Sequence, residues 1–283
     1  MKTGAHYLKV TFSMAVVFAL ALLATAAQAA PITFANAVLA DTPIGYWRLN
    51  EMPGAITALD ISGNANHGTY SATGITLGQP GLGGGDTAAL FDGLGNGRIV
   101  VPNSATLNPA NITMEALLSW SGPNGFQQRI LEKSRFPGGE LPQYGLNILN
   151  DGRVRVEIQV GATNSFLDST ATVLQGATTD LAATYDGSLM RIYINGVLDS
   201  AQAPTLTGGL PFDFTDLGIG NQVDRPRAFN GIIDEVALYG SALSADRIQA
   251  HFAATAVPEP ASLLLLASGL VGLAAWRRRR SMQ

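Results

Sequence analysis

Residues 181–199 read LAATYDGSLMRIYINGVLD, three short apolar segments separated by Asp186-Gly187 and Asn195-Gly196. An Asx-Gly pair tolerates the positive φ angles that a two-residue hairpin turn requires. The stretch therefore predicts two consecutive β-hairpins and, with them, three neighbouring strands of an antiparallel sheet.

The same pattern continues on both sides of this stretch. A further turn, Asn150-Asp151-Gly152, separates residues 144–149 from residues 153–158. Apolar and polar residues alternate at 44–49 and again at 113–120, as expected for half-buried strands. Residues 229–239 are predicted to form a long apolar final strand. Many short strands with local turns, and no helices alternating with them, predict an all-β antiparallel sandwich.

One helix is predicted after the last strand. Ser244 is suited to be its N-cap, and Asp246 falls in its first turn. Ile248 and Phe252 are four residues apart, so we expect both side chains to dock the helix on the sandwich. Trp47 and Trp120 lie in apolar strands and are expected in the core.

Composition restricts the function. The chain has 283 residues and no cysteine, which excludes disulfides and Cys-ligated zinc. Residues 31–256 contain 11 basic and 20 acidic residues, so this part carries a net charge of −9. A nucleic-acid-binding domain would be expected to show a basic stripe, and none is found, so we expect no nucleic-acid partner. The acidity suits solubility outside the cytoplasm and binding of divalent cations.

The N-terminal residues 1–29 have the three parts of a signal peptide. Lys2 and Lys9 are followed by an apolar stretch, and Ala27 and Ala29 provide the small residues at which signal peptidase cleaves. A permanent membrane helix is the alternative, but the apolar run is short and ends at the small-residue site. We therefore expect cleavage after Ala29 and export through the inner membrane.

The C-terminal residues 257–283 contain three features in order. Pro258-Glu259-Pro260 comes first, and the uncharged residues 261–276 follow. As a helix, these 16 residues would span about 24 Å, which is less than the hydrocarbon core of a bilayer at about 30 Å. Arg277, Arg278, Arg279 and Arg280 then form a basic stop on the cytoplasmic side. An ordinary tail anchor is the alternative.

This order resembles the PEP-CTERM sorting signal that exosortase enzymes read. The resemblance implies a C-terminal transmembrane helix as a transient anchor, cleavage near the Pro-Glu-Pro motif, and delivery to the surface or extracellular matrix of a Gram-negative, exopolysaccharide-producing cell.

The domain between, residues 31–256, is similar to a second known family. Its segments follow one another as YWRLNE (46–51), DISGNANHG (60–68), ALFDG (89–93), ATYDG (183–187), IYING (192–196) and FNGIIDEV (229–236). This succession resembles the laminin-G-like branch of the concanavalin-A-like lectin/glucanase superfamily. The resemblance implies a jelly roll of two curved antiparallel sheets that binds a polysaccharide or a surface protein, and some relatives are glycosidases.

The sequence offers little for catalysis. Retaining glycosidases of this superfamily carry paired glutamates in a Glu-x-Asp-x-x-Glu run, and no such run is present. Glu115, Glu132 and Glu157 stand singly on different predicted strands. Asp234 and Glu235 are adjacent, so in a regular strand they would point to opposite faces and could not act as a pair. We therefore expect no enzyme activity.

A structural calcium ion is the expected cofactor. Asp60 and Asn64 lie in an oxygen-rich loop, Asp234 is a carboxylate on an apolar strand, and Ca²⁺ prefers such oxygen ligands. Jelly rolls similar to this one often hold calcium between an N-terminal loop and an Asp of the last strand. Alternatively, Asp60 caps a turn and Asp234 accepts hydrogen bonds from loop N–H groups.

Two loops are the candidate ligand-binding rim. They combine planar, amide and guanidinium groups that stack on or hydrogen-bond sugars; the residues are Arg135, Phe136, Asn221, Arg225 and Arg227. Plain solvated loops are the alternative. The sequence thus predicts a non-catalytic exported binding protein, with a glycan-active enzyme or a purely structural biofilm component as the other hypotheses.

Overall fold

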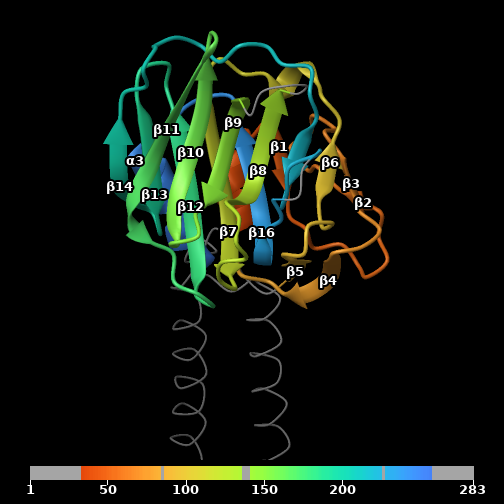
Figure 1. Cartoon of the computed structure of the whole chain (residues 1–283). Helices are drawn as coiled ribbons and strands as arrows, with labels where there is room; N and C mark the ends of the chain where they lie inside the picture. Colours follow the sequence, from red (N-terminus) through yellow and green to blue (C-terminus); the bar gives the residue numbers. More distant parts are fainter. Residues whose placement is uncertain (1–32, 84–85, 136–140, 225–226, 257–283) are drawn as a thin grey trace, which may run out of the picture. The chain divides into compact units, whose positions relative to one another are not determined.

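The structure is a computed structural model that describes residues 33–83, 86–135, 141–224 and 227–256 (Figure 1). The predictions for residues 1–29 and 257–283 lie outside these residues. Within them, no helix has both the length and the apolar character needed to cross a membrane.

The described chain forms two sheets in which neighbouring strands are antiparallel. Sheet A contains β14 (Val197–Gln202), β13 (Met190–Ile194), β12 (Thr178–Tyr185), β7 (Ile112–Trp120), β16 (Asn230–Tyr239), β5 (Thr87–Asp92) and β4 (Ile75–Pro80) in that order, with β1 (Gly45–Trp47) also paired to β16. Sheet B contains β11 (Thr163–Thr172), β10 (Arg153–Val160), β9 (Leu141–Ile148), β8 (Gln128–Arg135), β15 (Leu217–Ile219), β6 (Ile99–Val101), β3 (Gly68–Tyr70) and β2 (Thr57–Ala58). The predicted all-β sandwich is confirmed, and its architecture is that of a jelly roll.

The predicted hairpins are present, but β12 and β13 are joined by four residues, 186–189, and not by a two-residue turn. Strand β12 pairs with β13 from Leu181↔Ile194 onward, and Asn195 has a φ of +52° in the turn to β14. The turn at residues 150–152 joins β9 to β10. The local turn chemistry therefore set these pairings.

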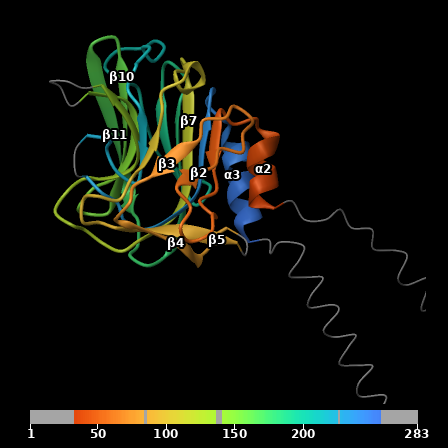
Figure 2. The ribbon, with the colours of Figure 1, turned by 90° about the vertical axis from the view of Figure 1, so that its right-hand side faces the viewer.

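The core lies between the two sheets, which face each other in Figure 2. Trp47 is 0% and Trp120 is 3% exposed, as expected for core residues. Each indole N–H finds a partner: Trp47 donates to the carbonyl of Asn66 and Trp120 to the side chain of Gln128. The buried indoles therefore carry no unsatisfied donor.

Two helices, α2 (Phe34–Ala40) and α3 (Ala245–Thr255), pack together on the outer side of sheet A (Figure 2). Helix α3 is the predicted one, and Ser244 caps it by accepting the N–H of Arg247. Its docking face differs from the prediction, since Ile248 is buried but Phe252 is 37% exposed. Helix α2 was not predicted; only strands and turns were expected there. A short 3₁₀ turn, η1 (Ala105–Leu107), follows β6.

A β-bulge interrupts the last strand. The register between β16 and β7 shifts between Asp234 and Ala237, and Glu235 has a φ of +51°. This conformation adds a residue to one strand and re-aims the side chains around it. The prediction that Asp234 and Glu235 point to opposite faces is therefore wrong, because alternation holds only in a regular strand.

Candidate functional site

A row of four residues crosses the outer face of sheet B. Glu157 on β10 pairs with Phe166 of β11 on one side and with Gly145 of β9 on the other, and Gly145 in turn pairs with Glu132 of β8. The intervening residues of β9 and β10 belong to the core, so these four face outward. Gly145 has no side chain, and its neighbours lie over it: a Cβ there would meet Glu132 Cγ and Oε2 and Asn147 Nδ2, each at 3.5 Å. We call these four residues the Glu row.

The neighbouring row supports the Glu row. Asn147 of β9 pairs with Arg155 of β10 and with Arg129 of β8. Arg155 forms a bidentate ion pair with Asp168, with distances of 2.6 and 2.9 Å. Its guanidinium carbon lies 4.1 Å from the ring centroid of Phe166, and this phenyl ring is 52% exposed. Phe166 is therefore an exposed aromatic surface with one face held by a cation.

The other end of the Glu row is a buried charge cluster. Arg129 Nε lies 2.5 Å from Glu132 Oε2, and Arg129 Nη1 lies 3.5 Å from Glu157 Oε2. The amides of Gln127 and Asn147 donate to Glu157 at 3.1 and 3.4 Å. Burial raises the pKa of Glu132 to about 7, against the lowering effect of Arg129, and Glu157 raises it further.

Several buried polar atoms of this face have no hydrogen-bond partner. They include Glu132 Oε1 and Oε2, Arg129 Nε and Nη1, Asn147 Oδ1 and Gln159 Oε1. Although Arg129 Nε is close to Glu132, its N–H does not point at the carboxylate, so the contact is a charge pair without a hydrogen bond. Buried polar groups in proteins are nearly always satisfied by protein, water or ligand. This cluster therefore has the chemistry of a polar binding site.

The five predicted ligand-binding residues do not form one group on this face. Phe136 and Arg225 lie outside the described residues, and Arg135 ends β8. Asn221 is fully buried: its Oδ1 accepts the backbone N–H groups of Gln222 and Arg227. It organises its loop and has no exposed surface for a ligand.

Arg227 lies beside the Glu row. Its carbonyl accepts the N–H of Arg129, and its charge lowers the pKa of Glu132.

Sequence reasoning missed Phe166, Glu157 and Glu132 as a site. The sequence does show polar residues alternating along 153–159, and this was the available signal. It does not show which strands lie side by side, so it could not place these residues in one row.

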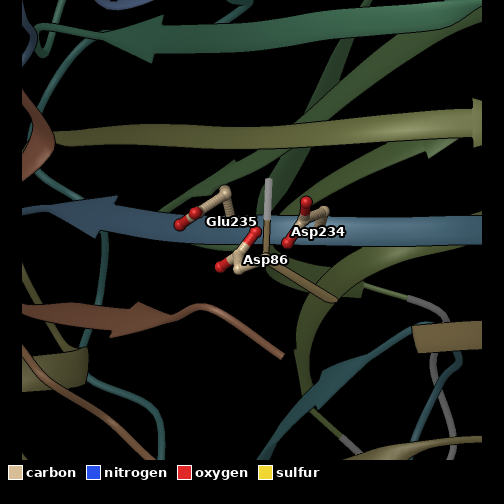
Figure 3. A group of neighbouring side chains, drawn as sticks. All are labelled: Asp86, Asp234 and Glu235. Atoms are coloured by element: carbon tan, nitrogen blue, oxygen red, sulfur yellow. The ribbon is translucent and has the colours of Figure 1, made fainter. Parts of the chain in front are cut away.

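A second polar cluster lies beside the bulge of β16 (Figure 3). Asp86, Asp234 and Glu235 each place a carboxyl oxygen within 4.8 Å of the others. Arg48 forms ion pairs with Asp86 at 2.7 Å and with Glu235 at 2.9 Å, and the Tyr46 hydroxyl donates to Glu235. Two of the three carboxyl groups, those of Asp86 and Glu235, thus share the guanidinium of Arg48.

Two oxygens of this acidic cluster are unpartnered. Asp234 Oδ2 accepts the N–H of Leu82 at 2.8 Å, but Asp234 Oδ1 and Asp86 Oδ1 are buried without a hydrogen bond. Burial, and then the charge of Glu235, raise the pKa of Asp234 well above its usual range. Burial raises the pKa of Glu235 to about 7 despite Arg48. Either protons or a cation would relieve this repulsion.

Asp60 and Asn64 lie elsewhere. Asp60 bridges to Trp47 of β1, and Trp47 pairs on its other side with Val236 of β16, so β1 separates Asp60 from the β16 carboxylates. The side chain of Asn64 donates to Ser62 at 3.2 Å and is exposed. The structure thus groups Asp234 with Asp86 and Glu235, and does not bring it together with Asp60.

The fold and these sites define the class: a lectin-type jelly roll with a polar, aromatic-edged outer sheet face. The sequence profile of the Concanavalin A-like lectin/glucanases superfamily matches residues 92–249, more than half of the chain. The chain belongs to this superfamily. The profile of the PEP-CTERM protein-sorting motif matches residues 256–280. This motif indicates export and membrane sorting, with a surface or extracellular location.

Solved structures agree with the fold. The binding domain of Paraclostridial Mosquitocidal Protein 1 has a TM-score of 0.60 at 14% identity, over 76% of this chain and 52% of that chain, so this protein spans about half of it. Domain 4 of AbnA, an extracellular arabinanase from Geobacillus stearothermophilus, was solved in complex with arabinotriose. It has a TM-score of 0.56 at 17% identity, and the match covers 74% of this chain and 98% of that domain. Trypanosoma rangeli sialidase in complex with sialic acid has a TM-score of 0.56 at 14% identity. The match covers 76% of this chain and 33% of that chain. No curated protein sequence matches significantly.

Proposed function

We propose that this protein is a non-catalytic glycan-binding protein of the bacterial surface or matrix, and that it binds its ligand on the Glu row of sheet B. The sorting motif supports export, and the superfamily supports recognition of a carbohydrate or a protein. We further propose that signal peptidase and exosortase process the two ends, that the membrane anchor is transient, and that the cell is Gram-negative.

The observation that carries the binding proposal is the composition of the Glu row. One end is the half-exposed ring of Phe166, a surface on which a sugar can stack. The other end holds the buried, unpartnered oxygens of Glu132. A glycan stacked on Phe166 would extend over Glu157 and Gly145 toward these oxygens. The complex of the similar arabinanase domain with arabinotriose is consistent with this proposal.

A second candidate function, glycoside hydrolysis, is favoured by one observation. Glu132 and Glu157 share one face, and burial raises the pKa of Glu132 to about 7, a property of a general acid. Against it, Arg129 contacts both carboxyl groups and holds them as an ion cluster. The binding function therefore has the stronger support.

The experiment is a glycan array probed with the full chain in detergent, followed by a hydrolysis assay on each hit. Binding without turnover is expected, whereas turnover would establish the enzyme and absence of binding would favour a purely structural biofilm component. Phe166→Ala should weaken binding by about tenfold, from the loss of one stacked sugar. Phe214→Ala is the matched control, because Phe214 is 83% exposed and lies outside the Glu row.

We also propose that calcium binds at the acidic cluster. The unpartnered oxygens of Asp86 and Asp234 fit a cation that takes carboxylate ligands, and they replace Asp60 and Asn64 in the original hypothesis. Calcium should raise Tm, and Asp234→Asn should abolish that increase while Asn64→Ala should not. An equal calcium response in wild type and Asp234→Asn would refute this site.

A further inference from the structure

We infer that the Glu row selects neutral, hydroxyl-rich glycan segments and rejects segments that carry carboxylate or sulfate groups. The inference rests on the proposed binding function and specifies the chemical class of its ligand. Its basis is the hydrogen-bonding type and the charge of the groups that the site leaves unpartnered.

The orientation of the side-chain amides is determined by their partners. The NH₂ group of Asn147 donates to the carboxylate of Glu157 at 3.4 Å, and that of Gln159 donates to the carbonyl of Gly161 at 3.0 Å. Both partners are acceptors, so the amide nitrogens must face them. The unpartnered Asn147 Oδ1 and Gln159 Oε1 are therefore true carbonyl oxygens.

The unpartnered groups are mainly acceptors. Glu132 contributes two oxygens, Asn147 one and Gln159 one, whereas Arg129 contributes two N–H donors. A sugar hydroxyl both donates and accepts, so adjacent hydroxyls can satisfy both kinds of group. A carboxylate or sulfate only accepts, and it would leave the four oxygens unsatisfied.

The charges act in the same direction. A ligand on the Glu row lies over Glu132 and Glu157, and Arg129 already contacts both of them. Arg155 is engaged by Asp168 in its bidentate pair. An anion at this position therefore faces two carboxyl groups, while Arg129 and Arg155 are already held in ion pairs, and like charges brought together oppose binding.

The test compares each neutral glycan that the full chain binds with the same glycan oxidised to the uronate at C6. Wild type should bind the neutral form at least about tenfold more tightly. Glu132→Gln should shrink this ratio severalfold, whereas Phe166→Ala should weaken both forms and leave the ratio unchanged. Should Glu132→Gln fail to fold, the wild-type ratio should still shrink at high salt, because screening weakens repulsion between charges.

The outcomes separate this inference from the proposed function. Equal or tighter binding of the oxidised form would overturn the inference and leave glycan binding intact. No binding of any glycan would refute the proposed function, and the inference with it. A ratio unaffected by both Glu132→Gln and salt would show that discrimination arises outside the Glu row.

Discussion

Asp60→Ala tests whether Asp60 holds the N-terminal loop to β1. The carboxylate is 6% exposed; Oδ1 accepts the N–H groups of Tyr46 at 2.9 Å and Ser62 at 2.8 Å, and Oδ2 accepts that of Asn66 at 2.8 Å. Tyr46 and Asn66 are buried, so in the variant their N–H groups have neither the carboxylate nor water. Ser62 is partly exposed, and its N–H can be hydrated.

The magnitude follows from the two buried donors. Each unsatisfied buried N–H costs about 1–3 kcal/mol, so the variant should lose about 2–6 kcal/mol of unfolding free energy. For a domain of this size, 1 kcal/mol corresponds to about 2–4 °C, which gives a fall in Tm of roughly 4–24 °C.

The assay is thermal unfolding of the full chain in detergent, followed by tryptophan fluorescence, with and without EDTA. Asp151→Ala is the matched control: Asp151 also accepts a backbone N–H, that of Arg153, but its side chain is 51% exposed. The control should lose less than about 1 kcal/mol. A loss for Asp60→Ala no larger than the control, or one that disappears in EDTA, would refute the reasoning, since the second result would make Asp60 a metal ligand.

Three further predictions concern titration and packing. Burial lowers the pKa of His251, but hydrogen bonds, first to Glu115 and then to Asp41, outweigh this effect and raise the pKa above 6.5. The stabilisation of the fold by protonated His251 is therefore complete below pH 6.5 and is lost as the pH rises through the raised pKa of the folded state. His251→Asn should flatten this pH dependence of Tm. Glu132 has a pKa of about 7 in the folded state, so the stability of the fold falls between pH 4.5 and 7 as this group ionises. The Tm of Glu132→Gln minus the Tm of wild type should therefore be larger at pH 8 than at pH 5. The same difference at both pH values would contradict this prediction. Gly220→Ala should lose about 2–5 kcal/mol in denaturant unfolding, because its Cβ meets the ring of Phe91 and its φ is +74°; a loss below 1 kcal/mol would show that the loop adjusts freely.

The sequence alone predicted the strands, the hairpins and the class of fold. Asp186-Gly187 and Asn195-Gly196 act within a few residues of chain, so the turns they specify could be read directly. The same holds for Ser244 as a cap, and for Trp47 as a core residue in a strand of alternating polarity. Such signals are local, and a single sequence contains them in full.

The candidate sites depended on tertiary structure. Glu132, Gly145, Glu157 and Phe166 come from four strands, and only the register between these strands places them in one row. Likewise, the alternation rule separated Asp234 from Glu235, and the bulge, set by pairing with β7, brought them together. Alternation along a strand is a property of the local backbone, whereas register and bulges are decided by packing against partners distant in sequence.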